Sequence, residues 1–146
     1  MGTTVITGFG QVSQIEDIRD YMKRGKEIAK KQTNIFSKYL SENDLPAPTS
    51  WDHFVQPITE SPFSDKLMMY QASLMTASGM GNYGTAHSAS PRRDIAADYT
   101  RLLGEIGQFA EDGINLQIKY GWLERPPHAV QREESVKAKG RIRCFF

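Results

Sequence analysis

The feature that most constrains the fold is a long apolar repeat between residues 91 and 120. Apolar or small residues recur there at alternating steps of three and four: Ile95, Tyr99, Leu102, Ile106, Phe109, Gly113, Leu116 and Tyr120. This is the repeat of an α-helix that buries one face. Ser90 can cap its start, proline is favoured at the first helical position, and Gly121 suits a left-handed end. We therefore predict a helix over 91–120 that packs against other long helices.

The same repeat occurs in two further stretches. Residues 15–43 carry it at Ile18, Tyr21, Gly25, Ile28, Gln32, Ile35 and Tyr39, and residues 65–89 at Leu67, Tyr70, Leu74, Ala77, Gly81, Gly84 and Ser88. Residues 3–11 are apolar but supply only a short helix. The expected fold is an all-α bundle formed by a single domain over 1–124. The polar, basic segment 125–146 is expected to be mostly disordered.

The lengths of the connections select a topology. The links before residue 15 and around 88–91 are short, so the helices that each one joins should be antiparallel. Segment 44–64 holds four prolines and can extend to ~65 Å, whereas the 15–43 helix is ~42 Å long. The 65–89 helix can therefore start at the same end as the 15–43 helix. An up-down bundle with one long crossover is the ferritin-like arrangement.

Charged residues suggest a contact between two of the helices. Basic residues recur every seven positions on one flank of the 15–43 helix, and acidic residues do so on the corresponding flank of the 91–120 helix. In an antiparallel pair these flanks face each other, which predicts a ladder of ion pairs; two independent solvated faces are the alternative. The residues are Arg24, Lys31 and Lys38 on one side and Asp98, Glu105 and Asp112 on the other.

Three glycines interrupt the 65–89 helix. Gly79, Gly81 and Gly84 match the dinucleotide-binding fingerprint in spacing, but that motif needs a strand before it and here a helix precedes it. A glycine inside a helix costs ~1 kcal/mol relative to alanine. We expect the close approach of another helix to offset this cost, with a kink as the alternative.

The residues for catalytic or di-metal chemistry are sparse. A ferritin-like di-metal centre needs inward carboxylates and Glu-x-x-His pairs, and none of His53, His87 and His128 follows a glutamate at that spacing. We predict no enzyme activity and no cofactor. The only metal-ligand candidates are His87 and Gln32. Gln32 could also bond across the core or line a small polar cavity. The ordinary interpretations are a surface or boundary histidine and a glutamine that faces the boundary of the core.

Two arginines stand at the start of the 91–120 helix. Arg92 and Arg93 could bind an anion together with the helix N-terminus. The ordinary alternative is that Asp94 neutralises them, because positive charge at that end opposes the helix dipole.

The remaining composition favours a soluble protein inside the cell. The net charge of +1 gives no general attraction to nucleic acid. No stretch has the ~18 apolar residues of a membrane span, and no signal peptide is apparent. The single cysteine, Cys144, has no partner in the chain, which fits a reducing cytoplasm.

Because the first helix is too short to cover three long ones, either a second copy or a missing part of a longer protein should cover the gap. We expect a homodimer or a higher oligomer.

Several sequence blocks carry a family resemblance. The blocks SDKLMM, GNYGTA, SPRRD, AEDG and GWLE lie in order between Phe63 and Pro127. They resemble an uncharacterised ferritin-like family of spore-forming bacilli, related to the spore coat protein F group. The resemblance is to the second of two units, with a shortened first helix, and it ends near Gln131. It implies a ferritin-like fold and no established activity.

The function that follows is an expectation drawn from this resemblance. It implies a non-enzymatic structural or interaction protein associated with sporulation, with spore-coat proteins as partners and a cytoplasmic or spore location. One alternative is an atypical metal- or small-ligand-binding bundle. Another is a truncated remnant of a two-unit protein.

Overall fold

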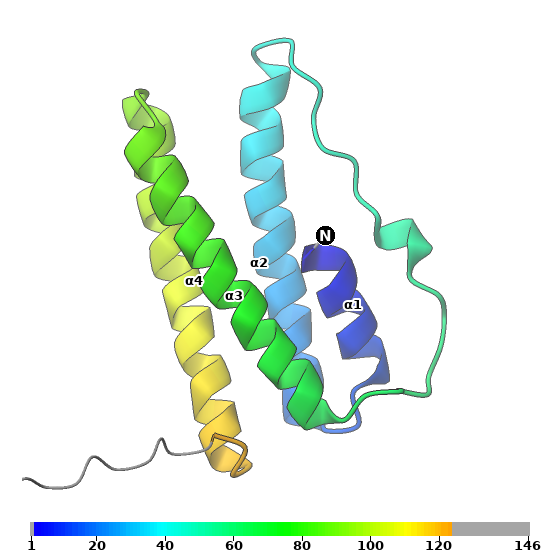
Figure 1. Cartoon of the computed structure of the whole chain (residues 1–146). Coiled ribbons are helices and arrows are strands. Elements are labelled where there is room, and N and C mark those ends of the chain that lie inside the picture. The colour runs from blue at the N-terminus through cyan, green and yellow to red at the C-terminus, as the bar shows by residue number, and fades with distance from the viewer. Residues whose placement is uncertain (1, 124–146) are drawn as a thin grey trace, which may run out of the picture.

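The computed structural model describes residues 2–123, which form an all-helical bundle, as predicted. Its helices are α1 (Gly2–Val12), α2 (Glu16–Ser41), α3 (Asp65–Ala89) and α4 (Arg93–Lys119), with a short 3-10 turn η1 (Asp52–Phe54). Helices α2, α3 and α4 run the length of the bundle, and α1 covers only its lower half (Figure 1). The predictions on Cys144, His128 and segment 125–146 lie outside the described residues.

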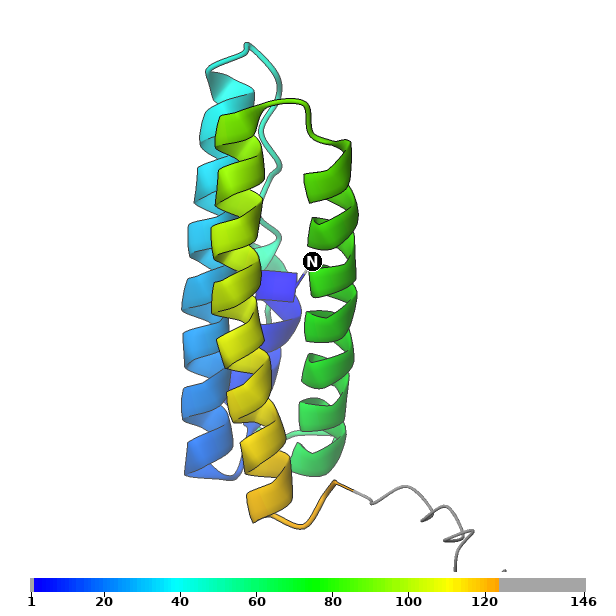
Figure 2. The same ribbon diagram turned by 90° about the vertical axis from the view of Figure 1, so that its left-hand side faces the viewer.

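Two helical hairpins and one long crossover make up the topology. Helices α1 and α2 form the first hairpin, α3 and α4 the second, and segment 42–64 runs back along the bundle to start α3 beside the start of α2 (Figures 1 and 2). The crossover is fastened to α1, since the side-chain amide of Gln11 donates to the carbonyls of Gln56 at 3.0 Å and Ile58 at 2.7 Å. Two antiparallel hairpins joined by one long crossover are the topology that the connection lengths predicted.

A buried carboxylate joins the two hairpins. Asp65, the first residue of α3, is 8% exposed. It accepts hydrogen bonds from the Ser13 hydroxyl at 3.2 Å and from the backbone N–H groups of Gln14 at 3.2 Å and Ile15 at 2.9 Å. These donors form the α1–α2 turn, and two of them are backbone groups at the start of α2, where a helix leaves N–H groups unpaired.

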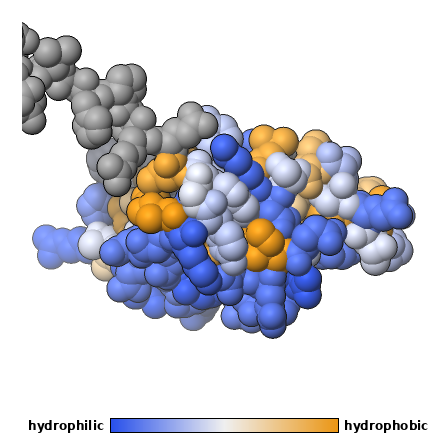
Figure 3. Space-filling view, turned by 90° about the horizontal axis from the view of Figure 1, so that it is seen from below, coloured by the Kyte–Doolittle hydropathy of each residue, from blue (hydrophilic) through white to orange (hydrophobic). Residues whose placement is uncertain are grey.

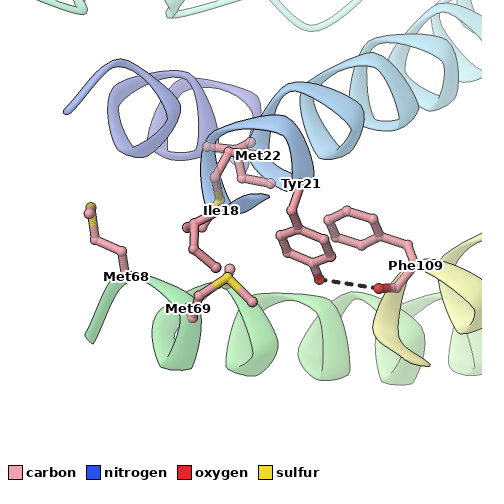
Figure 4. Packing of buried hydrophobic residues seen from close by; sticks show 8 residues of the cluster. Ile18, Tyr21, Met22, Met68, Met69 and Phe109 are labelled. Carbon is pink, nitrogen blue, oxygen red and sulfur yellow. Dashed lines mark hydrogen bonds between the residues drawn. The ribbon is translucent and has the colours of Figure 1, made fainter. Parts of the chain in front are cut away.

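The main core cluster lies in the lower half of the bundle, where all four helices meet. It consists of Ile6, Ile18, Tyr21, Met22, Met68, Met69, Ala72 and Phe109. The rings of Tyr21 and Phe109 stack with centroids 4.2 Å apart, and the Tyr21 hydroxyl donates to the Phe109 carbonyl at 3.2 Å (Figure 4). Beyond Gly25 in α2 and Ala72 in α3, Gln32 is the only buried residue of these two helices.

Two glycines allow α2 and α4 to approach each other. A Cβ added at Gly25 would lie 2.7 Å from Cζ of Phe109, and one added at Gly113 would collide with the hydroxyl of Tyr21. Close approach therefore occurs at these positions of the apolar repeat. Within one chain, the prediction of such an approach at Gly79, Gly81 and Gly84 is wrong, since an added Cβ at each of them meets nothing within 4 Å.

The predicted inner face of α3 is also wrong. Leu67, Tyr70 and Leu74 are 49%, 56% and 48% exposed. The core instead takes Met68, Met69 and Ala72 from α3. The two sets lie on opposite sides of the same helix, because the helix turns by about 100° per residue.

The two ends of α4 behave differently. Ser90 ends α3 in an extended conformation, as the residue before a proline prefers, and α4 begins at Arg93 rather than at Pro91. At the other end Gly121 adopts the predicted left-handed conformation, with φ of 67°. The N–H of Trp122 then bonds back to the carbonyl of Gln117 at 2.8 Å, which closes the helix end.

Candidate functional site

Two ion pairs cross from α2 to α4. Arg24 pairs with Asp112, and Nζ of Lys31 lies 2.8 Å from Oε1 of Glu105. These are the lower two rungs of the predicted ladder, and they lie in the orientation that an antiparallel helix pair requires. Three of the four side chains are about half exposed, so the pairs set the alignment of the helices more than their stability.

The third predicted rung, between Lys38 and Asp98, is wrong. Nζ of Lys38 instead lies 3.8 Å from Glu42, one turn along its own helix. The carboxylate of Asp98 accepts from the Tyr39 hydroxyl at 2.7 Å and from Arg101 at 2.8 Å. The hydrogen bond to Asp98 raises the pKa of Tyr39, because it stabilises the protonated hydroxyl.

The two arginines at the start of α4 have different surroundings. Nη2 and Nε of Arg92 bond the two carboxylate oxygens of Asp94 at 2.6 and 3.2 Å, and the guanidinium lies 5.5 Å from the centre of the Tyr39 ring. The neighbouring guanidinium lowers the pKa of Asp94. Arg93 is exposed. The Asp94 carboxylate therefore neutralises the guanidinium of Arg92, which is the ordinary alternative to anion binding.

The two metal-ligand candidates have separate partners. Nδ1 of His87 donates to the carbonyl of Ala96 at 3.1 Å, and Oε1 of Gln32 accepts from the Tyr83 hydroxyl at 3.1 Å. Burial raises the pKa of Tyr83. Across residues 2–123 no group of three or more histidine, cysteine, aspartate or glutamate side chains could hold a metal ion.

A groove of about 880 Å³ opens beside Gln32, between α2 and α3 and above the N-terminal end of α1. The short α1 leaves this part of the bundle uncovered (Figure 1). Gln32 is 9% exposed, and its Nε2 has no hydrogen-bond partner. The side chain therefore places a polar group in the wall of a largely apolar groove.

An exposed surface that begins with large apolar residues follows α3. It consists of the residues that the repeat placed on the inner face, all of which are exposed: Leu67, Tyr70, Leu74, Ala77, Gly81, Gly84 and Ser88. We call this the α3 outer face. Large side chains make up its first half and small ones its second half. Sequence reasoning found these residues but assigned them to the core.

The apolar surface continues onto α4. Nε2 of Gln117 donates to Oγ of Ser73 at 2.6 Å, which holds the two helices side by side. Next to this bond Ile114 and Ile118 are 45% and 58% exposed. Apolar residues also reach the surface where the molecule is viewed from below (Figure 3).

No helix within residues 2–123 is long and apolar enough to cross a membrane.

Comparison with known proteins gives a family and a fold. The family described as "Protein of unknown function (DUF3231)" matches residues 1–134. No curated protein matches the chain. The structure is similar to the crystal structure of a "putative spore coat protein" from Bacillus halodurans C-125, with a TM-score of 0.81 and 18% sequence identity. That similarity covers 89% of this chain and 87% of the other, and at this identity it shows the fold alone.

Proposed function

Because this chain belongs to the DUF3231 family, whose function is unknown, we propose a function from its surfaces: a non-enzymatic helical scaffold of the bacterial spore. In this role the protein associates with copies of itself and with other spore-coat proteins. The observation that carries the proposal is the α3 outer face, which exposes Leu67, Tyr70 and Leu74 by about half each. Contiguous exposed apolar surface on a soluble protein marks a binding surface.

The ionisable groups of the described residues support a structural role. The pKa of Asp17 is lowered by hydrogen bonds from Lys119 and Tyr120 on the surface, and that of Asp94 by Arg92. Burial raises the pKa of Tyr21. Active sites usually place a perturbed acid or base in a cleft beside its reaction partner. Each of these shifts instead has a structural cause in a surface pair or in the packed core.

The spore assignment draws on the similar protein from Bacillus halodurans, which is described as a putative spore coat protein. The long crossover between α2 and α3 also supports placing this bundle in the ferritin-like class. Both the cellular role and this class are part of the proposal.

Two measurements test the proposed function. A fluorescent fusion produced in a sporulating Bacillus should concentrate at the developing spore, and the purified chain should sediment as a dimer or larger species. A double variant, Leu67→Asp with Tyr70→Asp, should disperse the fusion and weaken assembly, because two charges would then have to be buried. Lys30→Asp, an exposed change on α2, is the control. An evenly spread wild-type fusion or a monomer at all concentrations would defeat the proposal.

The groove beside Gln32 favours a second candidate function, the binding of a small ligand. A buried amide without a partner costs ~1–3 kcal/mol, and a ligand with a carbonyl or carboxylate group could accept a bond from Nε2. A screen of small carboxylates by NMR would follow the side-chain NH₂ signal of Gln32, with Gln32→Leu as control. Metal analysis of the purified protein tests the alternative that the ligand is a metal ion. Protein free of metal, with an unperturbed Gln32 signal, would exclude this candidate.

A further inference from the structure

The α3 outer face has a size pattern that is complementary to itself. Its seven positions descend from large to small along the helix, from Leu67, Tyr70 and Leu74, through Ala77, to Gly81, Gly84 and Ser88. Reversing the order pairs each large residue with a small one. Leu67 then faces Ser88, Tyr70 faces Gly84, Leu74 faces Gly81, and Ala77 faces itself.

We propose that two copies of this chain pair antiparallel along their α3 outer faces, with a two-fold axis near Ala77. The proposal rests on the proposed function in one respect, that the chain associates with itself. The large half of each face then packs on the small half of the other, so each contact occurs twice, as a two-fold interface requires. A parallel pair would instead set glycine against glycine and leave space unfilled, which loses packing contacts.

The glycines support this arrangement. Gly81 and Gly84 have nothing within 4 Å of an added Cβ inside the monomer, so no contact within one chain explains the lost helix stability. Across the proposed interface they provide the space that the Leu74 and Tyr70 side chains of the second copy need. Small residues at such a contact also let two helices come close together.

The absence of charge along α3 is the second support. From residue 67 to residue 89 the helix contains no Asp, Glu, Lys or Arg, whereas α2 carries them throughout. Charged residues are depleted where a protein interface is fully buried. A helix whose outer side faced only water would have no physical reason to exclude them.

The available area suits a modest affinity. A 25-residue helix is ~37 Å long and ~11 Å across, which gives about 400 Å² per copy. The flanking Ile114 and Ile118 widen the contact toward the roughly 1,000 Å² in total at which specific interfaces begin. We therefore expect a dimer with a dissociation constant in the micromolar range.

A size swap tests the pairing. Leu74→Ala removes the large partner of one layer, and Gly81→Leu fills its space, so each should weaken dimerisation about tenfold or more in sedimentation equilibrium. The double variant again sets a small residue opposite a leucine and should return to within about threefold of wild type. Gly79→Leu is the matched control, because Gly79 also meets nothing within 4 Å but lies on the opposite side of α3 from the outer face, at about 100° of helix turn per residue. It should leave the dissociation constant unchanged.

A cysteine placed at the proposed axis tests the alignment. In a Cys144→Ser background, Ala77→Cys should form a disulfide between copies under mild oxidation, since its two Cα atoms would lie close together. Gln108→Cys, exposed on α4, should cross-link much more slowly. Circular dichroism should show full helix content for every variant, and Gly81→Leu should raise helix stability.

The outcomes separate this pairing from the proposed function. A wild-type dimer unaffected by the size swap, or no faster cross-linking at Ala77 than at Gln108, would overturn the α3 pairing and leave the scaffold function standing. A monomeric wild type at all concentrations would overturn both.

Discussion

The contact between α2 and α4 at Gly113 can be tested by adding one methyl group. In Gly113→Ala the new Cβ would collide with the hydroxyl of Tyr21 and lie 2.9 Å from its Cζ. Tyr21 cannot easily move away, because it is 5% exposed, stacks on Phe109 and donates to the Phe109 carbonyl at 3.2 Å. The neighbour is therefore a ring held on several sides rather than the free end of a flexible chain.

Opposing effects set the size of the change. Replacing a helical glycine by alanine gains ~1 kcal/mol. Overpacking a filled core costs ~1–3 kcal/mol, and displacing the Tyr21 hydroxyl loses a hydrogen bond worth ~1 kcal/mol. We expect Gly113→Ala to lower the free energy of unfolding by ~1–3 kcal/mol.

The assay is urea unfolding followed by far-ultraviolet circular dichroism at one fixed protein concentration. Gly104→Ala, in the same helix but with nothing within 4 Å of its Cβ, is the control and should gain ~1 kcal/mol. Adding Tyr21→Phe to Gly113→Ala should recover part of the loss, because the colliding oxygen is gone. If Gly113→Ala proves as stable as Gly104→Ala, the close contact between α2 and α4 is not as described.

Three further predictions concern polar contacts. Glu105→Lys should cost ~1 kcal/mol by facing Lys31, and adding Lys31→Glu should restore most of it; a double-mutant cycle by urea unfolding measures this coupling. The folded-state pKa of Asp17 lies below its ordinary value of 3.8, so its stabilisation is complete above pH 3.8 and declines as the pH falls through the lowered pKa. The stability difference between wild type and Asp17→Asn should accordingly be present at neutral pH and shrink below pH 3.8. Asp65→Ala leaves three hydrogen-bond donors without their acceptor and should lower the free energy of unfolding by ~2–4 kcal/mol. Ser13→Ala removes only one of these donors and should cost less. Thermal unfolding compares the two variants.

Helices α2 and α4 could be predicted from the sequence because each has one apolar face and charges on the rest. Four of the five buried residues of α4, namely Leu102, Ile106, Phe109 and Gly113, belong to its predicted repeat, and Gln117 is the exception. For α2 the repeat likewise identified Ile18 and Tyr21. When only one face can be buried without burying charge, periodicity determines the orientation of the helix.

Contacts between helices could be predicted only in part. The seven-residue spacing placed Arg24 beside Asp112 and Lys31 beside Glu105, because spacing along two aligned helices is a regular quantity. It did not reveal the hydroxyl of Tyr39 at Asp98 or that of Tyr83 at Gln32. Those contacts depend on the distance between helix axes and on side-chain rotamers. The spacing of residues along a chain determines neither of them.

The misassigned face of α3 has a physical explanation that bears on function. Two stripes on this helix have helical spacing, and the core takes the one with Met68 and Met69, whose flexible side chains adapt to an irregular gap. The stripe with Leu67, Tyr70 and Leu74 points outward. Leucine and tyrosine have better-defined shapes and therefore suit a partner of defined shape. On the pairing proposed here, the repeat in α3 is a packing face whose partner is a second chain, and periodicity alone cannot distinguish a partner within the chain from one outside it.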